Sequence, residues 1–140
     1  MPDGTAPMID VPPTAPGEWS IAQIEYALSR PLPAQLLKQK KKGGNTLDYL
    51  PWYRAVKILN KYAPGWGSEV RSMQQIGDNL CLSVALSIPT SSGIVTREAT
   101  GIESLNCSSF GDPASNAQSM ALRRAAAQFG LGLHLYEKAK

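Results

Sequence analysis

The sequence predicts an α+β fold in which a three-stranded antiparallel β-meander is packed with helices. Three extended segments, about residues 66–75, 80–88 and 94–103, follow one another along the chain. Their connections, Gly77-Asp78-Asn79 and Thr90-Ser91-Ser92-Gly93, are short and rich in residues that tolerate turn conformations. Connections of this length join neighbouring antiparallel strands, so the three segments are expected to form one meander.

The middle segment predicts how the sheet is covered. Its apolar side chains stand at every second position: Leu80, Leu82, Val84, Leu86 and Ile88. Successive side chains of a strand point to opposite faces, so these residues share one face. A face this apolar has to be buried, and the helices predicted before and after the meander are the elements that can cover it.

The chain before the meander divides into an arm and a domain. Residues 1–17 hold five of the eleven prolines and no apolar periodicity, which predicts a disordered arm. Residues 18–140 are expected to form a single domain. Within it, Ser20 is a helix cap, and the short amphipathic helix that follows ends at Pro31.

A basic segment comes next, KQKKKGGNT at residues 38–46. It has no hydrophobic anchor and includes Gly43-Gly44, so we expect a mobile basic loop. Lys40, Lys41 and Lys42 are its candidate contacts with a polyanion.

A second helix is predicted to start at Pro51 and to end at Pro64-Gly65. With about 100° between successive residues, its apolar side consists of Trp52, Ala55, Val56, Leu59 and Tyr62. The opposite side consists of Arg54, Lys57 and Lys61. The helix therefore buries one side in the domain and presents positive charge on the other.

The last helix is capped by Asp112 or Ser115, runs to about Phe129 and is ended by Gly130 and Gly132. Its predicted inward stripe is Ala114, Gln118, Ala121, Leu122, Ala125 and Phe129. Arg123 lies nearly opposite that stripe and Arg124 lies on its flank.

Positive charge is concentrated in one part of the chain. The net charge is +3, yet residues 38–61 hold seven Lys and Arg residues against one acidic residue. A local cationic surface indicates a polyanionic partner, although a lysine run that only keeps the protein soluble is an alternative. If the fold brings the cationic sides of both helices together, phosphates can lie against Arg54, Arg123 and Arg124.

Aromatic residues beside these cations are candidates for stacking on bases. We select Tyr53 for the site, and Tyr49, Trp52 and Trp66 are further candidates. The alternative is that these rings belong to the core, because aromatic residues at helical spacing are often buried.

Enzymes and metalloproteins are not indicated. Cys81 and Cys107 lack the spacing of metal ligands, and His134 is the only histidine. The chain has no GxxxxGK[ST] loop, and its acidic residues form no acid–base or metal motif. We therefore expect neither catalysis nor a cofactor, a metal or ATP.

The sequence also predicts a location. No apolar stretch approaches the roughly 20 residues of a membrane span, and no leader pattern opens the chain. We expect no membrane partner and a cytoplasmic or nucleoid-associated protein of bacterial or phage type, with an organelle as the other option.

Two segments carry a resemblance to a known family. YLPWYRAVKILNKYAPGW (residues 49–66) precedes the meander, and ALRRAAAQFGLGLHLY (residues 121–136) covers the end of the last helix. Together with the meander between them, they resemble the single-strand annealing proteins of the Rad fifty-two superfamily. The resemblance spans about residues 21–136, and the paired basic residues before Phe129-Gly130 are its most specific part.

The resemblance implies a β-β-β-α core whose subunits assemble into a ring or helical filament, with single-stranded DNA in an outer groove. Arg54 matches a family arginine that contacts the strand, and Arg123 and Arg124 match a basic pair that contacts the backbone. The chain departs from the family at Ala127, where a further basic residue is common. It also has no evident match to the lysines that form a second DNA site in some members.

The predicted function is ATP-independent binding of single-stranded DNA and annealing of complementary strands in homologous recombination and DNA repair. The implied partners are single-stranded DNA, further copies of the chain, and a recombinase or exonuclease. Two alternatives stay open. One is a module that binds and protects single strands without annealing them, and the other is a structural protein whose cationic helices form a subunit interface.

Overall fold

The computed structural model describes residues 11–42, 44–106 and 112–138. In chain order its elements are α1 (Ile21–Leu28), the 3-10 helix η2 (Ala34–Leu36), β1 (Lys38–Lys42), β2 (Asn45–Tyr49), α2 (Trp52–Tyr62), β3 (Gly67–Ile76), β4 (Asn79–Thr90), β5 (Gly93–Ser104), α3 (Pro113–Ala127) and α4 (Leu133–Lys138). The strands form a two-stranded sheet and a three-stranded sheet.

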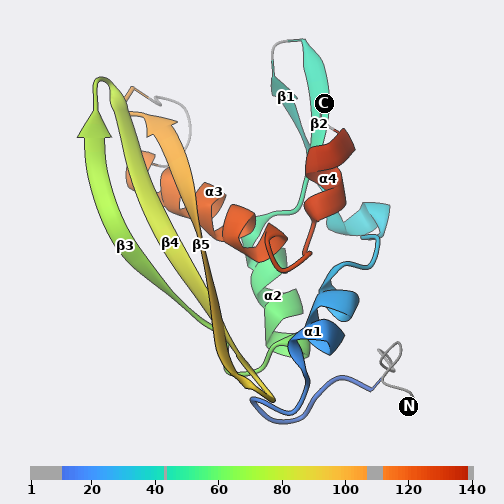
Figure 1. Ribbon diagram of the computed structural model, residues 1–140. Helices are drawn as coiled ribbons and strands as arrows, with labels where there is room; N and C mark the ends of the chain where they lie inside the picture. Colours follow the sequence, from blue (N-terminus) through green and yellow to red (C-terminus); the bar gives the residue numbers. More distant parts are fainter. Residues whose placement is uncertain (1–10, 43, 107–111, 139–140) are drawn as a thin grey trace.

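The predicted α+β meander is confirmed. Strands β3, β4 and β5 pair antiparallel in chain order and form one long curved sheet (Figure 1), and their bounds lie within two residues of those predicted. The apolar side chains Leu82, Val84, Leu86 and Ile88 of β4 are buried, as expected. Helix α3 crosses this face of the sheet, and α1 and α2 pack beside it.

Helix α3 approaches the sheet very closely at Gly101 of β5. A Cβ atom there would collide with the carbonyl oxygen of Ala117 and lie 2.8 Å from the amide nitrogen of Ala121. Ala117 and Ala121 are fully buried, and with Leu82 and Val84 they form a separate core cluster. Small side chains on both elements thus allow backbone to meet backbone.

The predicted inward stripe of α3 is partly wrong. Ala121, Ala125 and Phe129 are buried, but Ala114 and Gln118 are exposed, and Ala117 faces the sheet instead. The helix is rich in alanine, so apolar periodicity defines its rotation only weakly. The close contact at Gly101 decides the rotation.

The ends of the helices follow their local signals. Ser20 and Gln23 form a capping box at α1, and the amide of Ser115 donates to Asp112 Oδ1 at 2.8 Å at the start of α3. This hydrogen bond lowers the pKa of the Asp112 carboxyl below its usual value. After α3, Gly130 adopts φ +109° and packs against Ser29, so a side chain there would be both strained and obstructed.

The core confirms the orientation of α2 apart from its first turn. Ala55 and Leu59 are buried in the main cluster with Ile24, Leu28 and Phe129 of other elements. Trp52, predicted on the apolar side, is instead half-exposed. It is the first residue of α2, and the main buried cluster reaches the helix only from Ala55 onward.

Residues 38–46 are not a loop. Strands β1 and β2 form an antiparallel hairpin, paired from Lys38 with Tyr49 to Lys42 with Asn45, and the hairpin stands beside α4 (Figure 1). The prediction failed because the lysine-rich strand has no apolar anchor of its own. Leu47 and Tyr49 of β2, which are half-buried, anchor the pair to the domain.

Of the predicted arm, residues 1–10 lie outside the described residues and residues 11–17 are described without a helix or strand. Pro13 is buried, and a Cβ atom at Gly65 would lie 2.8 Å from Cβ of Pro16. A proline without apolar periodicity can still come close to the domain where a glycine such as Gly65 offers no Cβ to obstruct it. Among the described helices, none is both long and apolar enough to cross a membrane.

Candidate nucleic-acid interface

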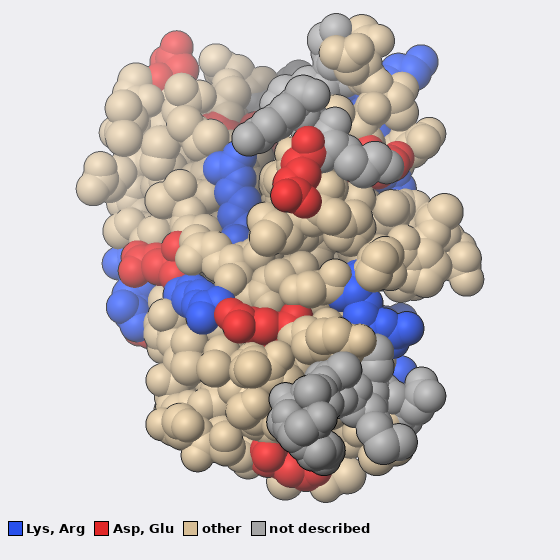
Figure 2. All heavy atoms as spheres, turned by 45° about the vertical axis from the view of Figure 1, so that its right-hand side comes forward, with Lys and Arg blue, Asp and Glu red and all other residues tan. Residues whose placement is uncertain are grey.

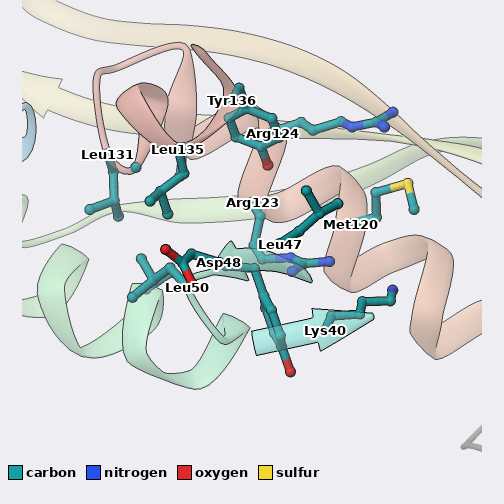
Figure 3. A pocket seen from close by; sticks show the side chains of 14 residues that line it. Lys40, Leu47, Asp48, Leu50, Met120, Arg123, Arg124, Leu131, Leu135 and Tyr136 are labelled. Carbon is teal, nitrogen blue, oxygen red and sulfur yellow. The ribbon is translucent and has the colours of Figure 1, made fainter. Parts of the chain in front are cut away.

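A cavity of roughly 210 Å³ lies between the β1–β2 hairpin, α3, α4 and the start of α2. Its lining residues are Lys40, Leu47, Asp48, Tyr49, Leu50, Ala55, Met120, Arg123, Arg124, Ala126, Leu131, Gly132, Leu135 and Tyr136. Figure 3 shows Leu50, Leu131 and Leu135 on one side, whereas the nitrogen-bearing ends of Lys40, Arg123 and Arg124 extend toward the other. The cavity therefore combines a wall of leucines, beside which Asp48 lies, with a cationic edge.

Arg123 is the most constrained cation of this edge. It is half-buried, its Nε donates to the carbonyl oxygen of Ser119 at 3.3 Å, and its guanidinium carbon lies 5.4 Å from the centroid of the Tyr49 ring. A guanidinium carries five N–H donors, so this contact with the helix leaves most of them available to an anion. Arg123 is thus held in place before any ligand binds.

Arg124 and Lys40 complete the cationic edge from two further directions. Arg124 is exposed, and its Nη1 donates to the carbonyl oxygen of Thr100 at 3.2 Å, which holds the side chain along the sheet. Lys40 is exposed on β1. A single cavity therefore receives cations from α3 and from the hairpin.

Arg54 does not line this cavity but belongs to a second cationic cluster at the first turn of α2. Its Nη1 donates to the carbonyl oxygen of Gln35 at 3.0 Å, and its guanidinium carbon lies 5.7 Å from the centroid of Tyr53. Lys38 Nζ lies 5.6 Å from the same centroid. A hydrogen bond from Lys38 and the charges of Lys38, Arg54 and Lys57 lower the pKa of Tyr53, against a smaller opposing effect of desolvation.

The hairpin connects the two clusters. Lys38 is the cross-strand partner of Tyr49, and directly opposite residues of an antiparallel pair have neighbouring side chains on one face. Lys38 contacts Tyr53, and Tyr49 contacts Arg123. Neighbouring side chains thus link Arg54 to Arg123. Neither arginine takes part in the two ion pairs within the described residues, which are Arg71–Glu69 and Arg97–Glu25.

Other candidates of the sequence lie apart from the cavity. Lys61 Nζ lies 5.2 Å from the ring of Tyr62, which stacks on Trp19 away from the start of α2. Lys41 is exposed, but adjacent strand residues point to opposite faces, so it does not accompany Lys40. The side chain of Lys42 lies outside the described part of the chain.

The cations do not form one continuous stripe on the face that Figure 2 shows. Blue side chains occur there in separate groups, and those at the left border red carboxylates. The predicted channel is therefore represented in the structure by a cavity with a cationic edge and the adjoining cluster at α2. Within the described ranges, no group of three or more His, Cys, Asp or Glu side chains is placed to hold a metal ion.

Sequence reasoning missed Lys38 and Tyr136 as parts of this region. Lys38 precedes Lys40 by two residues and therefore shares its face of the strand, a signal that is visible only if the segment is recognised as β-structure. Tyr136 reaches the cavity because the chain turns back at Gly130 and Gly132, and α4 then returns to the hairpin (Figure 1).

Comparisons with known proteins agree on one family. Residues 20–140 match the model of the Rad52/22 family double-strand break repair protein. Over 128 residues, the chain is 34% identical to the mitochondrial DNA repair RAD52-like protein 1 of Arabidopsis thaliana. The matched region covers 90% of this chain and 73% of that relative. Over 122 residues, it is 35% identical to the chloroplastic DNA repair RAD52-like protein 2 of the same plant. That matched region covers 84% of this chain and 61% of the relative.

The predicted location is wrong. We expected a cytoplasmic or nucleoid-associated protein of bacterial or phage type, but both relatives are eukaryotic proteins of organelles. Composition and charge reflect the partner and the fold of a domain, and they do not distinguish a bacterial host from a eukaryotic one.

The extent of these matches decides the family. The family model covers nearly the whole described domain, and the mitochondrial relative is matched over more than two thirds of its length. The chain therefore belongs to the Rad52/22 family of double-strand break repair proteins, which act in DNA repair and recombination and are not enzymes in the catalytic sense.

Proposed function

We propose that residues 18–140 bind single-stranded DNA and anneal complementary strands without ATP. The observation that carries this proposal is the convergence of Lys40, Arg123 and Arg124 on one cavity whose other wall is mainly leucine, with Asp48 beside it. Phosphates bind the cations, while sugars and the faces of bases contact apolar and aromatic side chains. Arg54, Lys57 and Tyr53 extend the same surface beyond the cavity, and Lys41, Lys42 and Lys61 add longer-range attraction.

The lining suits binding that does not depend on base sequence. Leu47, Leu50, Leu131 and Leu135, which line much of the cavity, carry no group that hydrogen-bonds to a base edge, and we assign the cations of its edge to phosphates. A strand that is held by its backbone keeps its base edges available to a complementary strand. This is the state from which annealing proceeds, and a recombinase or an exonuclease that generates single strands is the proposed partner class.

A strand-annealing measurement tests the proposal. Two complementary oligonucleotides carrying a fluorescence donor and acceptor are mixed with and without the protein, in the absence of ATP. We expect the protein to accelerate pairing, with less acceleration as salt rises, because binding releases counterions. Tight binding of each strand with no faster pairing would favour a module that only protects single strands.

We also propose that copies of the chain assemble through β3. Helix α3 covers β4 and β5, whereas Val70 and Met73 on the same face of β3 are 40% and 57% exposed. β3 is also an edge strand with unpaired backbone groups. Apolar side chains grouped beside an open edge are typical of a contact between subunits.

Replacing Met73 with Glu is expected to reduce the assembled mass, because a carboxylate has to be desolvated in the contact. Light scattering after size-exclusion chromatography measures this mass. Gln74→Glu is the matched control, since it adds the same charge to the adjacent exposed residue on the opposite face. A monomeric wild-type protein, or equal masses for both variants, would contradict assembly through this face.

A further inference from the structure

Two aromatic rings stand exposed at the first turn of α2. Trp52 is 50% exposed and Tyr53 is 38% exposed, and their ring centroids are 6.1 Å apart in an edge-to-face arrangement. The other two tryptophans, Trp19 and Trp66, make contacts within the domain. Trp19 is buried, and the half-buried Trp66 donates its indole N–H to Asn60 Oδ1 at 2.7 Å.

The surroundings of this pair are cationic. Lys38 and Arg54 approach the ring of Tyr53 at 5.6 and 5.7 Å, and Lys57 lies one helical turn after Tyr53 on the same side of α2. None of the three is in either ion pair of the described residues. Exposed aromatic faces bordered by cations complement an unpaired base next to its own phosphate, whereas a purely apolar protein partner would have to desolvate these charges.

The pair also lies next to the proposed DNA surface. Lys38 and Lys40 share one face of β1, about 7 Å apart along the strand, and Lys40 lines the cavity. A strand whose backbone lies at the cavity edge can therefore continue past Lys38 to the start of α2.

We propose that Trp52 and Tyr53 form a stacking subsite for an unpaired base of single-stranded DNA, beside the cations Lys38, Arg54 and Lys57. This inference rests on the proposed function and adds to it a contact with a base rather than with the backbone. Stacking is tolerant of sequence, so the subsite is compatible with binding that ignores base identity.

Intrinsic fluorescence reports on the subsite directly, because Trp52 is the most exposed of the three tryptophans. The probes are an oligothymidylate of about 30 nucleotides and an abasic strand of the same length, which keeps the phosphates but offers no base to stack. We expect oligothymidylate to quench the wild-type emission and the abasic strand to quench it much less. Trp52→Phe removes the quenched signal and keeps an aromatic ring, so its affinity is expected to change little.

Affinity is measured separately by anisotropy of the labelled strands. Trp52→Ala is expected to bind oligothymidylate about 5- to 10-fold more weakly and the abasic strand like wild type. Trp66→Phe is the matched control and is expected to retain the quenching, with its fold checked by circular dichroism.

The outcomes separate the subsite from the function on which it rests. If wild type binds neither strand, the proposed function and the subsite both fail. If wild type binds but Trp52→Ala binds each strand as tightly as wild type does, or the quenching persists in Trp52→Phe, the subsite is wrong and DNA binding stands. If the emission changes with protein concentration without DNA, and Trp52→Ala lowers the assembled mass, the rings belong to a subunit contact and the subsite is overturned.

Discussion

Replacing Arg123 with alanine is expected to weaken binding of single-stranded DNA by about 10- to 100-fold at moderate salt. Hydrogen bonds to a charged group contribute about 1.5–3 kcal/mol each, and every 1.4 kcal/mol corresponds to about a factor of ten in affinity. Arg123 is held by the carbonyl oxygen of Ser119 and by the Tyr49 ring before DNA binds, so little side-chain entropy is lost on binding. Anisotropy titrations at several salt concentrations measure both the affinity and its salt dependence. The slope of log affinity against log salt concentration should become shallower by about one, the value for one lost phosphate contact.

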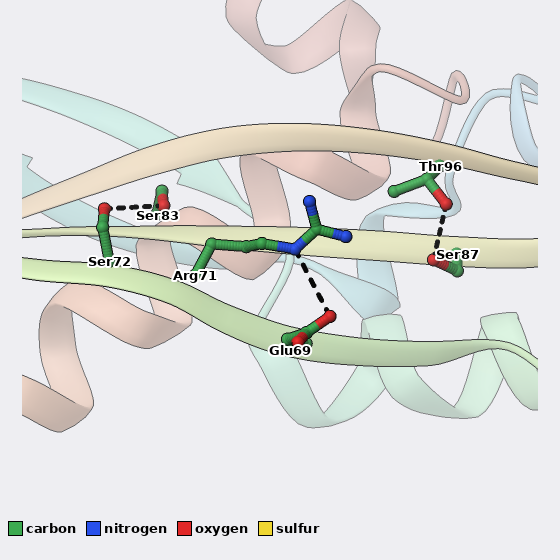
Figure 4. A network of polar contacts seen from close by, with 6 residues as sticks. All are labelled: Glu69, Arg71, Ser72, Ser83, Ser87 and Thr96. Carbon is green, nitrogen blue, oxygen red and sulfur yellow. Dashed lines mark hydrogen bonds and ion pairs between the residues drawn. The ribbon is translucent and has the colours of Figure 1, made fainter.

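Two variants control this experiment. Arg71→Ala removes the same charge from β3, where Arg71 pairs with Glu69 on the side of the sheet away from α3 (Figure 4), and it should leave binding nearly unchanged. Arg123→Lys keeps the charge but loses the planar donor group over Tyr49, so an intermediate affinity is expected. Equal losses in Arg123→Ala and Arg71→Ala would mean that net charge, rather than the cavity, determines binding.

Replacing Gly101 with valine is expected to lower the free energy of unfolding by more than about 3 kcal/mol. The new Cβ atom would meet the backbone of α3 at Ala117 and Ala121, and backbone cannot rotate away as a side chain can. The helix would have to move off the sheet and carry Arg123 and Arg124 with it, so DNA binding should fall as well. Urea denaturation followed by circular dichroism at one protein concentration measures the change.

Gly67→Val is the matched control for this substitution. Gly67 also lies in a strand, but no atom lies within 4 Å of the position that a Cβ would take. Valine favours strands, so the stability of this variant should remain within about 0.5 kcal/mol of wild type. If Gly101→Val were equally stable, α3 would not pack on β5 as closely as the structure has it.

Elements whose signals lie within a few residues could be predicted from the sequence. The turns at 77–79 and 90–93 and the alternation in β4 define the meander, because hairpin geometry and strand period depend only on neighbouring residues. The capping box at Ser20 and the break at Gly130 are local in the same way. The pair Arg123 and Arg124 is likewise a motif of adjacent residues.

Other features depended on contacts between distant segments. The basic residues 38–42 form a strand because they pair with β2, which supplies the apolar anchors. The close contact at Gly101 sets which side of α3 faces the sheet. Pro16 lies close to the turn at Gly65 because a glycine there leaves room for it. Trp52 is exposed although Leu50 before it and Ala55 after it are both buried in the main core. None of these contacts leaves a periodic pattern in the sequence.

Signals between near neighbours thus specify the meander, the helices that cover it and the cationic residues available for a polyanion. Packing between distant segments places Lys40 with Arg123 and Arg124, and links Arg54 to them through Tyr53, Lys38 and Tyr49. The difference is one of range. Turns, caps and strand alternation arise from interactions between near neighbours, whereas this surface arises from packing between a hairpin and a helix that are far apart in the chain.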